Sequence, residues 1–383
     1  MLKTVHRHWA ATVVLIVVGL LVVGLTPAAN ADGRHKPERP ARYVSGWMPY
    51  WNPTGSTASV QANAKVFADA SPFVFSASSA RTIALRLSSY SWLQMRQALL
   101  RSGVANVPTV TTDMTAAEFA SLLSSPKRRT EHAKALVALV DRYHLQGIDL
   151  DYESINFGST ADKATIRKLY PLLLRAIDRR LDSRRAVTSV TVAARTSATD
   201  PNWWVFDYDA LGAEADRVRI MTYDYSWSGG PAGPIAPKWW VREVAAYAAS
   251  AIAPRKVSLG MPAYGRDWFL RTVSGNCPAS AQTTLSRSTR SMRDFARSVG
   301  VRPQWRENGT SARFTYVQKY RSENKSCKAQ RVVWFDNARS LRAKTPLVDR
   351  YNLRGIAIWA LGNEGGQAWP TLTRYGRQLA KAR

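Results

Sequence analysis

The segment GIDLDYES places carboxylic acids at three alternate positions, Asp149, Asp151 and Glu153, which we call the acidic row. Alternate side chains of a β-strand point to the same face, so neighbouring acids would lie about 6.6 Å apart along the strand. Carboxylates this close repel each other, and the pKa of at least one of them should rise. A carboxyl group that stays protonated can give its proton to a leaving group. The segment therefore predicts general acid catalysis.

The residues between the acids are apolar, and they indicate which structure positions the acidic row. Ile148, Leu150 and Tyr152 suit packing against a layer of helices, so the acids would point into the interior of a barrel. Glu153 would then lie nearest the carboxyl end of the strand, where barrels of this kind place their active sites. Buried carboxylates are costly unless they are hydrogen-bonded or protonated. We therefore expect Glu153 to be a buried proton donor.

Two other structures fit the same segment less well. An edge strand with a solvated acidic face would also alternate acids with apolar residues. A calcium-binding loop of the EF-hand kind needs glycine at its sixth position, where this chain has Ser154, and polar residues between the acids.

Strand-like runs alternate with amphipathic segments of helical length along most of the chain. There are eight such runs, at residues 44–51, 73–78, 107–112, 147–153, 188–194, 217–224, 257–264 and 355–362. The intervening segment 131–143 is typical, because Leu136, Leu139 and Val140 recur on one helical face. Eight strands alternating with helices predict an α/β fold, a closed (β/α)8 TIM barrel.

The spacing of the strands breaks once, between the seventh and the eighth. The residues there include a helical run at 291–299 and strand-like runs at 303–306, 312–317 and 331–335. One crossover needs far fewer residues, so we expect a small α+β insertion at 269–335. The barrel would then comprise residues 43–268 and 336–383.

The N-terminus has the pattern of a secretory signal peptide at residues 1–31. Lys3 and Arg7 precede an apolar run at 10–25, and small residues spaced A-x-A follow at 29–31. An uncleaved membrane anchor is the alternative, since the apolar run is only slightly short for a span. Both interpretations place the protein outside the cytoplasm, as a secreted or cell-wall-associated protein. Residues 32–42 are polar and basic, which predicts an exposed linker.

The chain has two cysteines, Cys277 and Cys327. In an oxidising compartment an even pair favours a disulfide, and the alternative is two free thiols. The bond would close a loop of about 50 residues and stabilise the fold by about 4 kcal/mol on the chain-entropy model.

The formal net charge is +27, and loss of Lys3 and Arg7 with the signal peptide would leave +25. Such a surface attracts polyanions, which for a secreted protein include anionic cell-wall polymers and acidic lipid headgroups. The charge is spread along the chain without a nucleic-acid-binding motif, so nucleic acid is not an expected partner. A merely solvated arginine-rich surface is the alternative. No metal-binding or nucleotide-binding motif is present, and we expect no cofactor.

Beyond the acids themselves, GIDLDYES resembles the D-x-x-D-x-D-x-E signature of glycoside hydrolase family 18, the chitinase-like enzymes. Gln146 stands where that signature has its first acid. The resemblance extends over residues 43–375, with similar stretches at 45–51, 221–237, 259–268 and 355–364. The loop that ends in GPIAP is most similar to the branch with spore-germination and cortex-lytic glucosaminidases.

The resemblance implies a role for each residue of the site. Glu153 would protonate the glycosidic oxygen, Asp151 would orient the substrate's acetamido group, and Asp149 would support Asp151. Tyr223 and Asp224 would shape the acetamido pocket. The aromatic floor and further sugar contacts would come from Trp359, Met221, Trp51, Trp227, Tyr264 and Trp268. The alternative for each aromatic residue is ordinary packing.

The implied function is hydrolysis of β-1,4-linked N-acetylglucosamine in chitin or peptidoglycan, by a retaining mechanism in which the acetamido group is the nucleophile. A chitinase-like lectin, which binds sugar without cutting it, is the main alternative. Such proteins typically lack the acid at position 153, which this chain retains. A polyanion-binding surface protein is a third interpretation. We expect a monomer.

Overall fold

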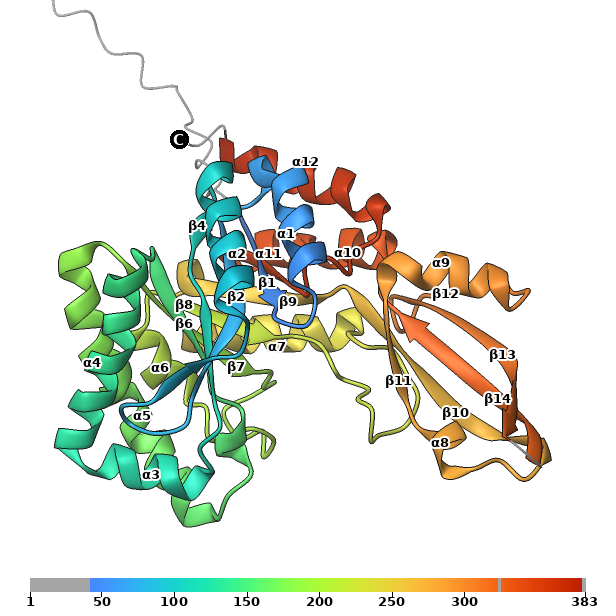
Figure 1. Ribbon diagram of the computed structural model, residues 1–383, viewed down its shortest axis with the longest axis horizontal. Coiled ribbons are helices and arrows are strands. Elements are labelled where there is room, and N and C mark those ends of the chain that lie inside the picture. The colour runs from blue at the N-terminus through green and yellow to red at the C-terminus, as the bar shows by residue number, and fades with distance from the viewer. Residues whose placement is uncertain (1–41, 323–324, 381–383) are drawn as a thin grey trace, which may run out of the picture. The chain divides into compact units, whose positions relative to one another are not determined.

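The computed structural model describes residues 42–322 and 325–380 (Figure 1). The predicted signal peptide and all of the predicted linker except Arg42 lie outside this part of the chain. Arg42 is buried, and its Nε lies 2.6 Å from Asp349 Oδ1. No helix in the described ranges is long and apolar enough to cross a membrane.

Eight parallel strands form a closed barrel, which confirms the predicted fold class. The first strand pairs with both the second and the last, and this pairing closes the sheet. The barrel strands are β1 (Tyr43–Pro49), β2 (Asp69–Ala77), β5 (Thr109–Thr112), β6 (Gly147–Asp151), β7 (Val187–Ala193), β8 (Arg217–Met221), β9 (Val257–Pro262) and β15 (Gly355–Trp359). Two short strands, β3 (Ile83–Leu85) and β4 (Ala105–Asn106), also pair with β2.

Helices follow the barrel strands and pack against them. The longer ones are α1 (Pro53–Ala62), α2 (Ser89–Ser102), α3 (Ala116–Ser124), α4 (Pro126–Tyr143), α5 (Thr160–Leu181), α7 (Lys238–Ala251) and α12 (Trp369–Ala380). The shorter ones are α6 (Tyr208–Glu214), α10 (Ala338–Lys344) and α11 (Pro346–Arg350). Apolar residues of these helices and of the strands form one continuous core.

Helix α4 shows how the local sequence sets these elements. The Ser125 side chain accepts a hydrogen bond from the Arg128 backbone N–H, and Pro126 occupies the first turn, where its missing N–H costs nothing. Leu136, Val137 and Val140 are on its buried face. The helix therefore begins before the predicted segment 131–143, at the residues that can start it.

Strand β6 is buried along its whole length, but it is shorter than predicted. It ends at Asp151, and Glu153 has helical backbone angles that lead into a short 3-10 turn at Ser154–Asn156. The prediction of a strand through Glu153 was wrong by two residues, because the chain turns at the rim of the barrel.

The insertion between β9 and β15 is an antiparallel sheet with two helices. Its strands are β10 (Tyr264–Gly275), β11 (Leu285–Ser288), β12 (Gln304–Arg306), β13 (Ser311–Ser322) and β14 (Lys325–Phe335), in the order β11-β10-β14-β13-β12. Its helices are α8 (Ala279–Gln282) and α9 (Thr289–Ser298). The sheet starts at Tyr264, earlier than residue 269, where the sequence analysis began the insertion.

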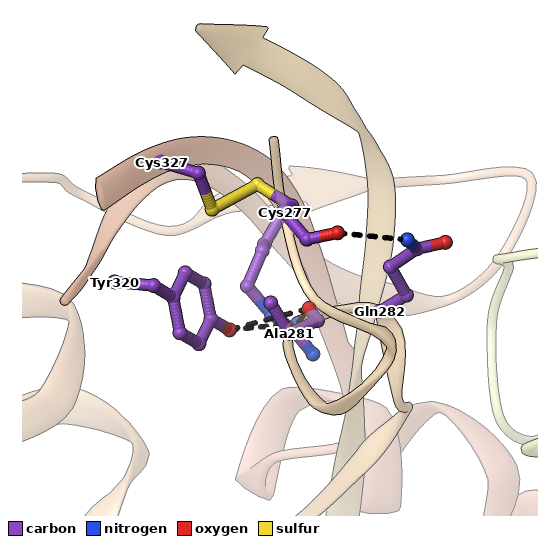
Figure 2. The surroundings of a disulfide bond; sticks show 6 residues. Cys277, Ala281, Gln282, Tyr320 and Cys327 are labelled. Atoms are coloured by element: carbon purple, nitrogen blue, oxygen red, sulfur yellow. Dashed lines mark hydrogen bonds between the residues drawn. A yellow bond between two sulfur atoms is a disulfide. The ribbon is translucent and has the colours of Figure 1, made fainter. Parts of the chain in front are cut away.

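A disulfide joins Cys277 to Cys327 in the insertion, as predicted (Figure 2). Cys277 follows β10, and Cys327 lies in β14, opposite Gly275 in the sheet. Two hydrogen bonds hold the adjoining turn. The Gln282 side chain donates to the Cys277 carbonyl (3.3 Å), and the Tyr320 hydroxyl donates to the Ala281 carbonyl (3.3 Å). The disulfide therefore ties the end of one strand of the insertion to a neighbouring strand.

Candidate active site

Asp149, the deepest acid of the row, is buried and fully hydrogen-bonded. It accepts hydrogen bonds from Ser189 Oγ (2.6 Å), Thr109 Oγ1 (2.9 Å), Thr191 Oγ1 (3.0 Å) and Trp47 Nε1 (3.3 Å). These donors come from strands β1, β5 and β7, so the closure of the barrel creates this environment. Asp149 is a fixed part of the barrel interior.

Arg219, on strand β8, is a charged partner of Asp149 that the sequence analysis missed. Its Nη1 lies 3.5 Å from Asp149 Oδ2, and its Nη2 lies 3.1 Å from Asp69 Oδ1 on β2. The guanidinium also donates a hydrogen bond to the Ser71 hydroxyl. We call Asp69, Asp149 and Arg219 the Arg219 cluster. A signal was available in the sequence, because Arg219 is at an alternate position along the strand from Met221 and Tyr223, two predicted site residues, and so shares their face.

Asp151, the middle acid, differs from its neighbour because it lacks partners. It is only 5% exposed, and its Oδ1 is buried without a hydrogen-bond partner among the described residues. Burial and then the negative charges of Glu153 and Asp149 raise the pKa of Asp151 well above its ordinary value, while Arg219 opposes this rise. An unpaired buried carboxyl group is costly, and such groups concentrate at functional sites.

Glu153 lies at the rim of the barrel and is exposed to solvent. The prediction of a buried proton donor was therefore wrong, because the strand ends two residues earlier. Protein atoms nevertheless displace part of its hydration, and this desolvation, followed by the negative charge of Asp224, raises the pKa of Glu153. A solvent-accessible carboxyl group with a raised pKa can still act as a general acid.

Tyr223 and Asp224 follow strand β8 and lie beside the acidic row. Burial, followed by the charge of Asp151, raises the pKa of the Tyr223 hydroxyl, so it remains a hydrogen-bond donor. Asp224 has a left-handed backbone (φ 57°) and accepts hydrogen bonds from Arg266 Nη2 (2.7 Å) and from the Tyr264 hydroxyl. Tyr264, predicted to contact sugar, is buried and supports Asp224 instead. Arg266 was missed by the sequence analysis.

Trp359, at the end of β15, is half-buried and surrounded by aromatic rings. Tyr223 stacks on it with ring planes 16° apart and centroids separated by 6.5 Å. Trp47, Trp51 and Phe73 meet it edge-on, with centroids 5.9, 5.9 and 5.2 Å away. The ring is therefore held in one orientation next to Tyr223, as a floor for a sugar would require.

The other predicted sugar contacts divide by exposure. Trp51 and Trp227 are each 56% exposed, so their rings are available for stacking. Trp268 is only 4% exposed, and its indole N–H donates to the Trp227 carbonyl (3.3 Å), so it supports the loop that carries Trp227. Met221 is half-buried and packs against the barrel core.

A cavity of about 620 Å³ lies elsewhere, between α9, α10 and the segment that follows β15. None of the five predicted catalytic residues lines it. No group of histidine, cysteine or carboxylate side chains in residues 42–322 and 325–380 is arranged to hold a metal ion.

The family model of "Glycosyl hydrolases family 18" matches residues 107–364, which is more than half of the chain. The protein belongs to this family. The match contains the whole acidic row, Tyr223, Asp224 and Trp359, so this family 18 protein is a glycoside hydrolase.

Several relatives of this family 18 chain have been described. An uncharacterized glycosylase, YvbX, of Bacillus subtilis is 27% identical over 256 residues, which are 66% of this chain and 68% of that one. The cortical fragment-lytic enzyme of Bacillus anthracis is 31% identical over 239 residues, 62% of this chain and 51% of the relative. The chain thus spans about half the length of that enzyme.

Solved structures confirm the family 18 fold. The spore cortex-lytic enzyme SleL of Bacillus cereus superimposes with a TM-score of 0.72 at 24% identity, covering 87% of this chain and 74% of that one. A chitinase from Chromobacterium violaceum superimposes with a TM-score of 0.73 at 21% identity, covering 90% of this chain and all of that one.

Proposed function

We propose that this protein hydrolyses β-1,4-linked N-acetylglucosamine polymers, with retention of configuration and with the substrate's acetamido group as nucleophile. The observation that carries the proposal is the state of Asp151. It is buried, it has an unpaired oxygen, and it lies between a fully bonded Asp149 and an accessible Glu153. A closed structural network would not leave that oxygen without a donor.

In the proposed first step, Glu153 gives its proton to the glycosidic oxygen as the bond to the anomeric carbon breaks. The acetamido oxygen attacks that carbon from the opposite face and forms an oxazolinium ion. Most retaining enzymes use a second carboxylate as the nucleophile, and family 18 is a known exception. Asp151, in its ionised form, accepts the acetamido N–H and stabilises the positive charge that develops.

In the second step, the Glu153 carboxylate takes a proton from water as the water oxygen attacks the anomeric carbon. The oxazolinium ring opens, and Glu153 is protonated again. Tyr223 would donate a hydrogen bond to the acetamido oxygen, and its contact with Trp359 fixes the direction of that bond. These roles agree with the raised pKa of the Tyr223 hydroxyl, since a phenol that stays protonated remains a donor.

Peptidoglycan is the substrate that we favour over chitin. Several relatives are named cortical fragment-lytic enzymes, and the insertion of this chain carries exposed positive charge. Lys319 and Lys328 are directly opposite each other in the β13–β14 pair, although like charges in such positions destabilise a sheet. An anionic cell-wall polymer would neutralise both ammonium groups. We also propose secretion to the cell wall, where the disulfide would persist.

The test is digestion of two substrates side by side, with mass analysis of the fragments. Chitin oligomers and purified peptidoglycan, with and without its attached anionic polymers, are incubated with the wild type and with Glu153→Gln. We expect the wild type to release fragments ending in N-acetylglucosamine. The variant should lose at least about 10²-fold in rate, as expected for a lost general acid, yet still bind the oligomers.

Two results would contradict this function. Full activity of Glu153→Gln would remove Glu153 from the mechanism. Binding of oligomers by the wild type without any cleavage would favour the lectin alternative.

A further inference from the structure

Arg219 occupies a position that most barrels of this fold fill with a branched apolar side chain. It is 1% exposed and bonds to Asp69, Ser71 and Asp149. Burying an arginine between carboxylates costs several kcal/mol of desolvation for each ion, and well-packed apolar residues are often at least as stabilising. Stability alone therefore does not account for a cation at this position.

The charges around Asp151 show what Arg219 does there. Glu153 and Asp149 face Asp151 from its own segment, and both are acidic. Tyr223, after β8, and Tyr170, on α5, face it with neutral hydroxyl groups whose pKa values burial raises. Arg219 is the cation among the described groups that act on Asp151.

Gln146, where the family signature has its first acid, does not contact the acidic row. Its side chain accepts from the Asn106 backbone N–H (2.9 Å) and donates to the His144 carbonyl (3.1 Å). The hydrogen-bond donors to Asp149 come from β1, β5 and β7, and its charged partner, Arg219, comes from β8.

We propose that Arg219 is a positioning residue, whose guanidinium supplies the counter-charge that allows Asp151 to ionise between two other carboxylates. Asp69 holds the guanidinium in place from β2. The inference rests on the role of Asp151 in the proposed function, where only the ionised form accepts the acetamido N–H. Without Arg219, Asp151 would keep its proton to higher pH.

The test is the pH dependence of kcat/KM on a chitin oligomer, for the wild type and three variants. The acid limb is the low-pH side of this profile, where activity falls as Asp151 becomes protonated. In Arg219→Gln this limb should move to higher pH, so that activity at the lowest pH values falls by about tenfold. The alkaline limb should stay in place, because Asp224 and not Arg219 acts on Glu153. Arg219→Lys keeps the charge, and its acid limb should lie closer to that of the wild type.

A uniform loss of kcat/KM at every pH in Arg219→Gln would overturn the inference, since it would indicate a structural role only. If this variant does not fold, the double variant Asp69→Asn with Arg219→Gln removes one charge of each sign. Arg217, which also pairs with Asp69, is not fully buried and keeps access to solvent there. The double variant should show the same movement of the acid limb, and an unmoved limb there would also overturn the inference.

Failure of the wild type to cleave any oligomer would count against the proposed function alone. In that case the pH dependence of oligomer binding is measured instead, by tryptophan fluorescence. Arg219→Gln should lose binding at higher pH than the wild type, and identical pH dependence would refute the role of Arg219.

Discussion

Two clusters of buried aspartate and arginine side chains lie in this protein, one in the insertion and one in the barrel. In the insertion, Asp267 is bonded to Arg331 Nε (2.8 Å), Arg287 Nη2 (2.7 Å) and the Tyr316 hydroxyl (2.7 Å). The remaining N–H groups of Arg331 reach backbone carbonyls such as that of Ala281 (2.7 Å). We call Asp267, Arg287, Tyr316 and Arg331 the Asp267 cluster.

The Arg219 cluster in the barrel has the same chemistry but is connected differently. Asp69 and Asp149 are both paired, yet the network continues along β6 to Asp151, whose Oδ1 has no donor in the described ranges. The Asp267 cluster is closed and holds strands together. The Arg219 cluster ends in an unpaired acid, and this open end agrees with the catalytic role that we propose for Asp151.

The largest expected effect is the loss of stability in Arg331→Met, which tests the structural role of the Asp267 cluster. Arg287 still compensates the charge of Asp267 in this variant, but Asp267 Oδ1 and several backbone carbonyls lose their buried donor. Each buried group left unsatisfied costs about 1–3 kcal/mol, so we expect a total loss of about 3–5 kcal/mol in the free energy of unfolding. Denaturant unfolding measures it. The pH dependence of kcat/KM should not change, because Arg331 lies far along the chain from the acidic row and bonds only within the insertion.

The matched control is Arg293→Met on the exposed surface of α9. Arg293 has no acid within 4.0 Å in the described ranges, so its loss should change stability by less than about 0.5 kcal/mol. Equal stability of the two variants would contradict a structural role for the Asp267 cluster.

Asp151→Asn should produce the next largest effect, this time on turnover. An amide cannot supply the negative charge that stabilises the oxazolinium ion, so we expect kcat to fall about 10²–10³-fold, or about 2.7–4 kcal/mol. Asp267→Asn is the control in the other cluster, and it should lose stability while it retains kcat. Wild-type turnover in Asp151→Asn would contradict the electrostatic role of Asp151. If the Asp151→Asn variant still cleaves a substrate with a hydroxyl in place of the amide, assistance by the acetamido group is excluded.

The sequence predicted the fold and the acidic row because both depend on local alternation. The acids of β6 and the eight strands follow from side-chain periodicity, which tertiary contacts preserve. The disulfide followed from an even number of cysteines. These features need no knowledge of which strands become neighbours.

The Arg219 cluster could not be predicted in the same way, because its three members lie on three strands. Only closure of the barrel brings Asp69 of β2 and Arg219 of β8 to Asp149. The misplacement of Glu153 and Tyr264 has a related cause. Strand periodicity does not show where β6 ends or where β10 leaves the barrel for the insertion, since packing partners decide both points.

Asp224→Asn should give the smallest effect and test the rim of the site. The Asp224 charge contributes to the raised pKa of Glu153, and Glu153 must be protonated to start the reaction. Removing that charge lowers the Glu153 pKa, so activity should be lost at lower pH as the pH rises. The unpaired Arg266 guanidinium, released from its 2.7 Å contact with Asp224, would add to this shift. The acid limb should remain in place, because Asp224 does not act on Asp151. An alkaline limb that stays in place or moves to higher pH would contradict the action of the Asp224 charge on Glu153.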